Sequence, residues 1–151
     1  MHILSPQPRI AELSMFFNVD TSVGEGGSNA SPEDILLVQF LVRKVGETVP
    51  PGAGVTLDRK ARMMRVPQTG VKDPLTADGI RAVQESMRDK VPSTKVDGRV
   101  SVARGYKYGG GAFTIVSLNA TVRAHFPRVW PRLQDFPDCP GLLRMRVQDV
   151  L

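Results

Sequence analysis

The pattern of apolar and polar positions predicts three helices, of which the first is the most strongly marked. Ser31 is suited to cap a helix and Pro32 to fill its first position, and two acidic residues follow where the helix dipole favours anions. The next eight residues are apolar except for Gln39. A buried strand also fits such a run, but the capping residues favour a helix over residues 32–45, buried on most sides.

Two further helices are predicted over residues 74–90 and 114–125. Asp73 and Pro74 repeat the start of the first helix, with a capping residue followed by proline. Apolar positions recur at helical spacing on one face of each segment: Thr76, Ile80, Val83 and Met87, then Ile115, Leu118, Val122 and Phe126. Gly79 costs a helix about 1 kcal/mol relative to alanine. Its presence suggests close contact with another helix.

The segments between these helices predict loops and short extended pieces. Residues 46–70 contain a Pro/Gly-rich turn and two β-like pieces, which predict a small hairpin around residues 58–60. The Asp97–Gly98 pair favours a tight turn, and the glycine-rich residues 105–111 predict a flexible loop. Residues 142–151 fit a strand and a helix equally well.

The two ends of the chain differ in composition from its middle. Residues 1–30 predict an N-terminal arm, because prolines interrupt its start and Gly, Ser and Asn dominate its second half. One helical turn of this arm is expected to pack on the body through Ile10, Leu13, Phe16 and Phe17. Residues 31–126 predict the helical domain, and residues 127–151 a proline-rich tail packed on it. The fold class expected is mainly α, with a small β-hairpin and extended termini.

Length and composition limit the class of protein. The chain has 151 residues, which is enough for one domain. No run approaches the roughly 18 apolar residues of a membrane span. The first residues lack the basic and then apolar pattern of a secretory signal peptide. We therefore expect synthesis in the cytoplasm without a signal peptide.

The net charge of +5 is unevenly distributed. Residues 1–50 hold 3 Lys/Arg and 6 Asp/Glu, a net −3, whereas residues 51–151 hold 17 and 9, a net +8. A basic region of this kind is either a solvated surface or a surface for a polyanion, such as nucleic acid, a wall polymer or an acidic protein. Nucleic acid is disfavoured, because the basic residues are scattered and no recognition helix stands out.

The first two predicted helices partly repeat each other, since each contains a Val-Gln pair, Val38–Gln39 and Val83–Gln84. The first helix reads L-L-V-Q-F-L over residues 36–41. Residues 69–76 read T-G-V-K-D-P-L-T and keep the Gly, Pro and Thr of the pattern D-G-x-F-G-P-x-T. Together with the turn at residues 96–100, these motifs resemble the helical peptidoglycan-binding domain-like family, in an extended variant found in phage-like gene sets.

The resemblance covers about residues 23–126. It implies a compact three-helix core of the peptidoglycan-binding-like type. Three residues depart from the family's pattern: Thr69, Lys72 and Asp73. From the chemistry of the residues themselves, we expect Gln39 and Gln84 to tie the loops between helices through amide hydrogen bonds.

The sequence offers binding residues rather than catalytic ones. A nucleophile requires a base and an orienting group, and His125, Cys139 and Asp97 are better explained by helix capping, a packed thiol and a turn cap. We expect no catalysis, no metal and no cofactor. The best candidates for ligand binding lie on the glycine-flanked loop, where rings can stack on sugars and cations can contact anions: Arg104, Tyr106, Lys107 and Tyr108.

These observations predict a non-catalytic module that binds bacterial cell-wall peptidoglycan. Without a signal peptide, such a module requires another route to the wall, such as a phage tail or a phage-like contractile particle. The alternative is a structural subunit of such a particle, which uses the same fold to dock on other subunits. In both cases we expect assembly partners to order residues 1–30.

Overall fold

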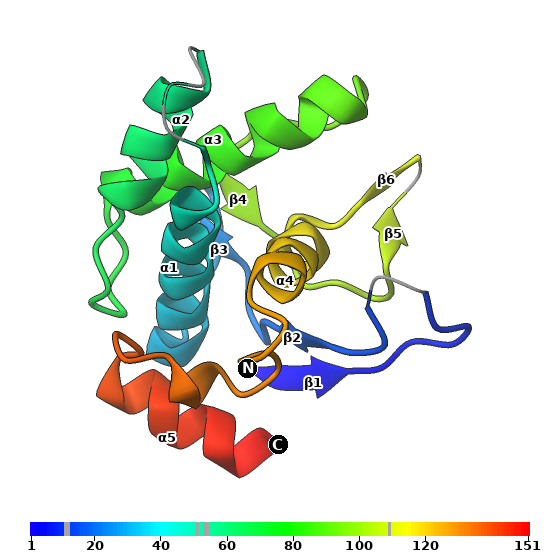
Figure 1. Ribbon diagram of the computed structural model, residues 1–151, viewed down its shortest axis with the longest axis vertical. Coiled ribbons are helices and arrows are strands. Elements are labelled where there is room, and N and C mark those ends of the chain that lie inside the picture. Colours follow the sequence, from blue (N-terminus) through cyan, green and yellow to red (C-terminus); the bar gives the residue numbers. More distant parts are fainter. Residues whose placement is uncertain (11–12, 51, 53–54, 109) are drawn as a thin grey trace.

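The structure, a computed structural model, describes residues 1–10, 13–50, 52, 55–108 and 110–151 and is mainly helical (Figure 1). Its helices are α1 (Pro32–Glu47), α2 (Val55–Met64), α3 (Pro74–Lys90), α4 (Thr114–His125) and α5 (Gly141–Val150), with a 3-10 turn at Leu133–Asp135. Short strands form antiparallel pairs: β1 (His2–Leu4) with β2 (Phe16–Asn18), β3 (Val23–Gly24) with β4 (Arg99–Val100), and β5 (Lys107–Tyr108) with β6 (Gly111–Ala112).

The three predicted helices are confirmed as α1, α3 and α4, and two of them have the predicted caps. The Ser31 hydroxyl accepts a hydrogen bond from the backbone N–H of Asp34 at 3.1 Å. The Asp73 carboxylate accepts one from the N–H of Thr76 at 2.9 Å. Each bond satisfies a donor that the first turn of a helix leaves free, so these starts are encoded locally.

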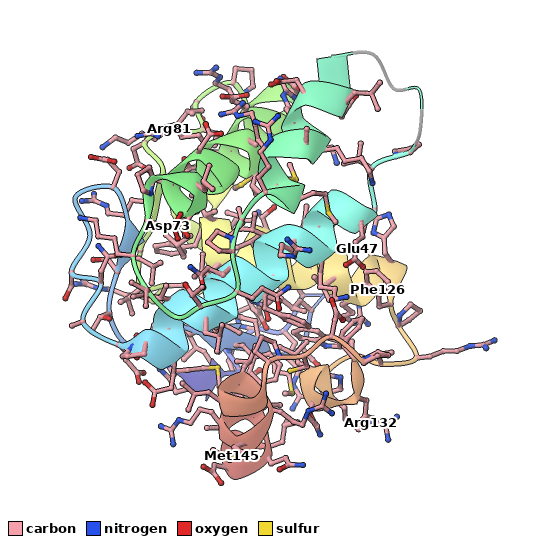
Figure 2. All side chains as sticks on the ribbon, turned by 90° about the vertical axis from the view of Figure 1, so that its left-hand side faces the viewer. Glu47, Asp73, Arg81, Phe126, Arg132 and Met145 are labelled. Carbon is pink, nitrogen blue, oxygen red and sulfur yellow. The ribbon has the colours of Figure 1, made fainter. Side chains whose placement is uncertain are left out.

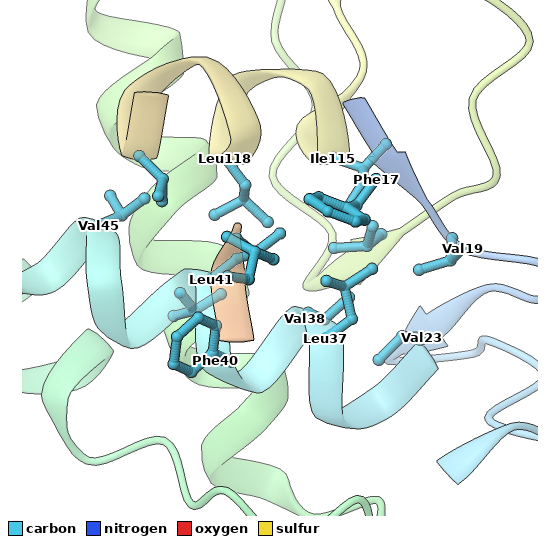
Figure 3. Packing of buried hydrophobic residues seen from close by; sticks show 14 of the residues in the cluster. Phe17, Val19, Val23, Leu37, Val38, Phe40, Leu41, Val45, Ile115 and Leu118 are labelled. Carbon is cyan, nitrogen blue, oxygen red and sulfur yellow. The ribbon is translucent and has the colours of Figure 1, made fainter. Parts of the chain in front are cut away.

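The core surrounds α1, which packs against α2, α3, α4 and α5. Figure 3 shows side chains of α1 meeting those of α4 and of β2 in one apolar layer. The residues at this junction are almost fully buried: Phe17, Leu37, Val38, Leu41, Val45, Ile115 and Leu118. Helix α1 is therefore covered on most sides, as its nearly continuous apolar run predicts.

Gly79 is required where α3 crosses the end of α2. A Cβ atom at this position would lie 2.2 Å from Cγ2 of Val66 and 3.2 Å from Cγ1 of Val42. The contact predicted for this glycine is confirmed. Gly79 lowers the helix propensity of α3, but its lack of a side chain lets α3 pack closely against α1 and the end of α2.

The N-terminal residues belong to the core, so the prediction of a peripheral arm with a helical turn is wrong. Phe16 and Phe17 are fully buried in β2, which pairs with β1. The side chain of Asn119 on α4 accepts from the N–H of Phe17 at 2.9 Å and donates to its carbonyl at 3.0 Å. A buried extended strand needs such partners for its backbone, and α4 supplies them. Whether partners order any of residues 1–30 stays a prediction.

The buried carboxylate of Asp34 ties this N-terminal segment to the start of α1. One oxygen accepts from the N–H groups of Asp20 and Thr21 at 3.0 and 2.8 Å. The other lies 2.8 Å from the ammonium of Met1, which also pairs with Asp20. Burial by itself lowers the pKa of this ammonium, but its hydrogen bonds to Asp20 and Asp34 and their charges outweigh burial and raise the pKa above 8.0.

The hairpin predicted around residues 58–60 is wrong, because this segment forms α2. Its Arg62 bridges to α3 through Asp78 and Glu85, at 3.0 and 2.9 Å, and these bonds raise the pKa of the guanidinium. At the same, C-terminal end of α2, Arg43 of α1 donates to the carbonyl of Met64 at 2.7 Å. These bonds to residues far away in the sequence stabilise a helix whose two ends lie in the β-like pieces V-T-L and M-M-R-V.

The C-terminal tail packs on the helical body, as predicted, and residues 141–150 resolve into a helix. The ammonium of Lys44 on α1 lies 4.6 Å from the ring centroid of Phe136 and 2.7 Å from a carboxylate oxygen of Asp138. Leu143 and Val147 bury one face of α5. None of the helices in the described residues combines the length and the apolar character that crossing a membrane requires.

Candidate binding cleft

Gln39 joins α1 to the turn that precedes α3. Its side-chain oxygen accepts from the N–H groups of Thr69 and Gly70 at 3.0 and 2.9 Å. Its amide nitrogen donates to the carbonyl of Val71 and to the hydroxyl of Thr76, both at 3.0 Å. Gly70 has a φ of +71°, which a side chain would strain. The buried amide of Gln39 thus provides hydrogen-bond partners for two N–H groups and one carbonyl of this turn.

Gln84 does the same between α3 and the turn at Asp97–Gly98. Its oxygen accepts from the N–H groups of Asp97 and Gly98 at 3.0 and 2.8 Å. Its nitrogen donates to the carbonyl of Arg99 at 2.9 Å and to the hydroxyl of Thr114 at 3.3 Å. Gly98 has a φ of +70°. The predicted role of both glutamines is therefore confirmed, and the two arrangements are structural repeats of each other.

A polar cavity of about 330 Å³ lies beside the second repeat. It is lined by Gln84, Met87, Ser93, Thr94, Lys95, Asp97, Arg99, Ser101, Gly111, Ala112, Phe113 and Thr114. The end of α3, the 93–101 segment, β6 and the start of α4 each supply a wall. This volume lies at the lower end of the range of about 300–1,000 Å³ typical of small-molecule sites.

The charges of the polar cavity lie near its exposed edge. The ammonium of Lys95 is 3.7 Å from Asp97, and the Lys95 side chain is 78% exposed. Asp97 also accepts from the Gln84 amide at 3.0 Å and from the N–H of Arg99 at 3.0 Å, so its carboxylate is fixed. The exposed ammonium of Lys95 lies near several hydroxyl groups of the lining. Such a site suits a polar ligand that carries hydroxyls and carboxylates.

A second hollow, the apolar groove, has a volume of about 690 Å³ and lies between α3 and α4. The end of α1 and part of α2 close it. It is lined mainly by apolar and small residues, among them Val45, Val49, Met63, Val83, Met87, Val91, Ala120 and Ala124. Met87, Thr94 and Ala112 line both hollows. The polar cavity and the apolar groove are therefore adjacent parts of one cleft.

The residues predicted to bind ligand are not brought together as one exposed surface. Arg104 and Lys107 are exposed, and Lys107 pairs in register with Ala112, which lines the polar cavity. Tyr106 is only 8% exposed, and its ring centroid lies 5.9 Å from that of Phe16. The expectation of an exposed stacking ring at Tyr106 is wrong, because Phe16 draws this ring into the core. The side chain of Tyr108 lies outside the described part of the structure.

The predicted flexible loop is a hairpin, β5–β6, that projects on the side of α4 away from α1 (Figure 1). Its second strand, rather than its tyrosines, borders the polar cavity. Sequence reasoning missed the cavity residues in the 93–101 segment, such as Lys95 and Arg99. The feature of the sequence that points to this segment is the Asp97–Gly98 turn. Gln84 holds that turn close to the start of α4, through hydrogen bonds to Gly98 and Thr114.

The side chains considered for catalysis have structural environments. The ring of His125 lies 3.0 Å from the carbonyl of Thr121 at the end of α4. Cys139 is buried, and desolvation raises the pKa of its thiol to about 11. The thiol is therefore protonated at neutral pH and a poor nucleophile. Asp97 caps its own turn through the N–H of Arg99, as predicted.

Comparison of the chain with protein-family models, with curated proteins and with solved structures found no match. The shape and chemistry of the cleft, together with the two glutamine-bound turns, are therefore the features on which a functional proposal rests.

Proposed function

We propose that the protein is a non-catalytic module that binds bacterial peptidoglycan in the cleft beside α3. The observation that carries the proposal is the polar cavity next to the turn bound by Gln84. Its hydroxyls, its Lys95 ammonium and the ring of Phe113 match the hydroxyls, carboxylates and ring faces of a wall saccharide. The resemblance to the peptidoglycan-binding domain-like family, carried by Gly70, Pro74 and Thr76, supports the same assignment.

A co-sedimentation assay with purified sacculi tests this proposal. We expect the wild-type chain to pellet with sacculi at low salt and to be released as salt rises, because exposed charges are screened. Lys95→Glu reverses a charge at the cavity edge and should weaken binding roughly fivefold, about 1 kcal/mol. Lys72→Glu makes the same change at an exposed lysine that lines neither hollow, and it should bind like the wild type.

Two outcomes bear on the assignment in different ways. If the wild-type chain does not pellet with sacculi at low salt, the proposal is wrong. If Arg104→Gln with Lys107→Gln weakens binding while Lys95→Glu does not, the ligand lies at the β5–β6 hairpin and the residues before it, where ligand binding is predicted from the sequence. We further propose that the module reaches the wall as part of a phage tail or phage-like particle, because the family variant that its motifs resemble is found in phage-like gene sets.

One observation favours the second candidate, a structural subunit that docks on other proteins. Helix α5 exposes two large apolar side chains, Leu142 at 43% and Met145 at 60%, and Leu151 directly after the helix is 51% exposed. Figure 2 shows Met145 on α5 at the edge of the molecule. Met145→Glu should leave sacculus binding intact. If the same variant abolishes assembly with co-expressed particle proteins, the docking role is supported.

A further inference from the structure

The apolar groove has the length and the walls to take a helix. On α3 its lining runs from Val83 to Val91, which is about 12 Å at 1.5 Å per residue, or about two helical turns. The α4 wall consists of small side chains that recur at helical spacing on one face: Ser117, Ala120, Thr121 and Ala124. Because the distance between two packed helices depends on the side chains at their contact, this wall allows a close approach.

The polar groups in the groove are bonded to their own chain. The hydroxyls of Thr48, Ser86 and Thr121 donate to carbonyls of their own helices or turns, at 2.7, 3.1 and 2.9 Å. An apolar side chain can therefore cover these hydroxyls without leaving a buried donor unpaired. Two of the apolar lining residues, Met63 and Val83, are almost fully buried and give the groove an apolar base.

The charges around the groove favour an acidic partner. No acidic residue of the described chain lines the groove, whereas Lys90, Arg123 and His125 do. Lys90 is exposed at the end of α3, and it forms no ion pair with any carboxylate among the described residues. A carboxylate at this rim therefore meets complementary charge and no competing anion in the lining. The groove suits a helix that presents apolar side chains and one carboxylate on the same face.

The exposed face of α5 has these properties. At about 100° per residue, Leu142, Met145 and Asp149 lie within about 60° of one another around the helix. All three are exposed, and Asp149 forms no ion pair among the described residues. On the opposite face, Leu143 and Val147 hold the helix on the body. This exposed stripe, Leu142 to Asp149, is about 10 Å long and so matches the length of the groove.

The two basic residues of α5 leave the charge of the exposed stripe negative. Arg144 donates to the carbonyls of Phe136 and Cys139 at 3.1 and 3.3 Å, so its guanidinium is directed at the tail of its own chain. Arg146 is half-buried and lies on the flank of the helix, between the exposed and the buried face. Asp149 is thus the charged residue within the stripe, and its sign is opposite to that of Lys90.

Helix α5 and the groove lie at different ends of the molecule. Figure 1 shows α5 at one end and α2 and α3, which contribute to the groove, at the other. In Figure 2, Met145 of α5 and Arg81 of α3 likewise mark opposite ends. A contact between the two surfaces of a single molecule is therefore impossible, but the groove of one molecule is open to α5 of another.

We infer that α5 of one copy of the chain docks in the apolar groove of a second copy. Leu142 and Met145 pack against the Ala120 wall, and Asp149 lies beside Lys90. Because the two surfaces differ, the contact is heterologous, and each pair still has one groove and one α5 for further copies. Such a contact builds a ring or a filament. The inference goes beyond peptidoglycan binding and does not rest on it.

Sedimentation equilibrium of the full chain measures this association. The contact involves few side chains, so it belongs with the weak interfaces that bury less than about 1,200 Å². We expect the average mass to rise above that of the monomer as the concentration approaches about 1 mM. Met145→Glu and Ala120→Phe should each abolish the rise. Circular dichroism shows whether Ala120→Phe is folded, and Ala124→Phe, at a more exposed position, is a second variant that fills the groove.

A mixture of two variants separates the heterologous contact from a symmetric one. Met145→Glu keeps an intact groove, and Ala120→Phe keeps an intact α5. Although neither should associate alone, the mixture should form a complex of two molecules and nothing larger. Symmetric pairing of α5 with α5 would instead leave Ala120→Phe associating alone, and that result overturns the inference.

An exchange of charges tests the ion pair. Lys90→Glu and Asp149→Lys should each weaken association roughly fivefold, and the variant with both changes should recover it. Lys72→Glu is the matched control, since this exposed lysine lines neither hollow, and it should associate like the wild type. A double variant that associates no better than the two single variants overturns the pairing of Asp149 with Lys90.

The inference is wrong if the wild-type chain stays monomeric up to about 1 mM. It is also wrong if Met145→Glu, or both variants that fill the groove, associate like the wild type. A monomeric chain whose binding to sacculi is weakened by Ala120→Phe would mean that a wall ligand, rather than α5, occupies the groove. Association without any binding to sacculi supports this inference and overturns the proposed function alone.

Discussion

The two glutamine-bound turns use the same hydrogen bonds but have different surroundings. In both, a buried glutamine accepts from two successive N–H groups and donates to the next carbonyl and to a threonine of the following helix. After Gly70 the chain enters α3 within four residues, and neither Gly70 nor Val71 borders the cleft. After Gly98 it forms β4 and the β5–β6 hairpin before it reaches α4.

This difference explains where the cleft lies. The polar cavity is lined by the end of α3, by the start of α4 and by residues of the segment that follows Gly98, among them Arg99, Ser101 and Gly111. The first repeat is closed and contributes stability, whereas the second is open and also contributes a candidate site. A repeated local device therefore does not imply a repeated function.

The largest effect is expected from disrupting the closed repeat. Gln39→Leu keeps a side chain of similar size but leaves the buried N–H of Gly70 without its partner, together with the other groups that Gln39 binds. We expect the free energy of unfolding to fall by about 3 kcal/mol, since each orphaned buried group costs about 1–3 kcal/mol. Urea denaturation measures this change. A loss below about 1 kcal/mol would mean that the turn is held by other contacts.

Disruption of the open repeat should cost less stability and more binding. Gln84 lines the polar cavity, so water can replace part of what Gln84→Leu removes. We expect a loss of about 2 kcal/mol in the free energy of unfolding. Sacculus binding should weaken in Gln84→Leu and stay unchanged in Gln39→Leu when both are assayed well below their melting temperatures. The reverse order of stability losses contradicts the distinction between closed and open repeats.

The ammonium of Met1 extends the comparison to pH, because it pairs with Asp34 in the first turn of α1, the helix that carries Gln39. Its pKa in the folded state is raised above 8.0, so its contribution to stability is fully present below about pH 8. It is lost as pH rises through the folded-state pKa. We expect the melting temperature to fall between pH 8 and pH 10.

Asp20→Asn removes one of the two carboxylates that raise this pKa, so its melting temperature should depend less on pH over the same range. Lys72→Gln is the control, because it changes the charge of the molecule without touching this cluster. A wild-type melting temperature that is constant up to pH 10 contradicts an ion-paired, folded-state role for the ammonium.

The parts of the fold that the sequence predicts are those set by local signals. Helices α1 and α3 follow from Ser31 and Asp73 as caps and from helical periodicity, and the role of Gln39 follows from one polar position in an apolar run. The sequence of α2 also has helical periodicity, but a glycine rather than a Ser or Asp precedes its first residue, and its two ends read as short strand pieces. Its stability depends on Arg43 and on partners in α3, which are far away in sequence.

The site was harder to predict than the fold, for the same reason. Residue type alone indicates the glycine-flanked tyrosines as binding residues. Their burial depends on tertiary neighbours, and Phe16, 90 residues earlier in the chain, packs against Tyr106. The polar cavity combines the end of α3 with residues 93–101 and 111–114. No local pattern marks such a combination.

The smallest effect, and the one that best separates burial from binding at the hairpin, is expected from Tyr106→Phe. The Tyr106 hydroxyl is buried and has no hydrogen-bond partner among the described residues. Its removal should leave the free energy of unfolding unchanged or raise it by up to about 1 kcal/mol, because an unpaired buried hydroxyl is costly. Sacculus binding should not change, since the ring packs on Phe16 rather than on a ligand. A loss of binding at unchanged stability would instead return Tyr106 to the binding surface predicted from the sequence.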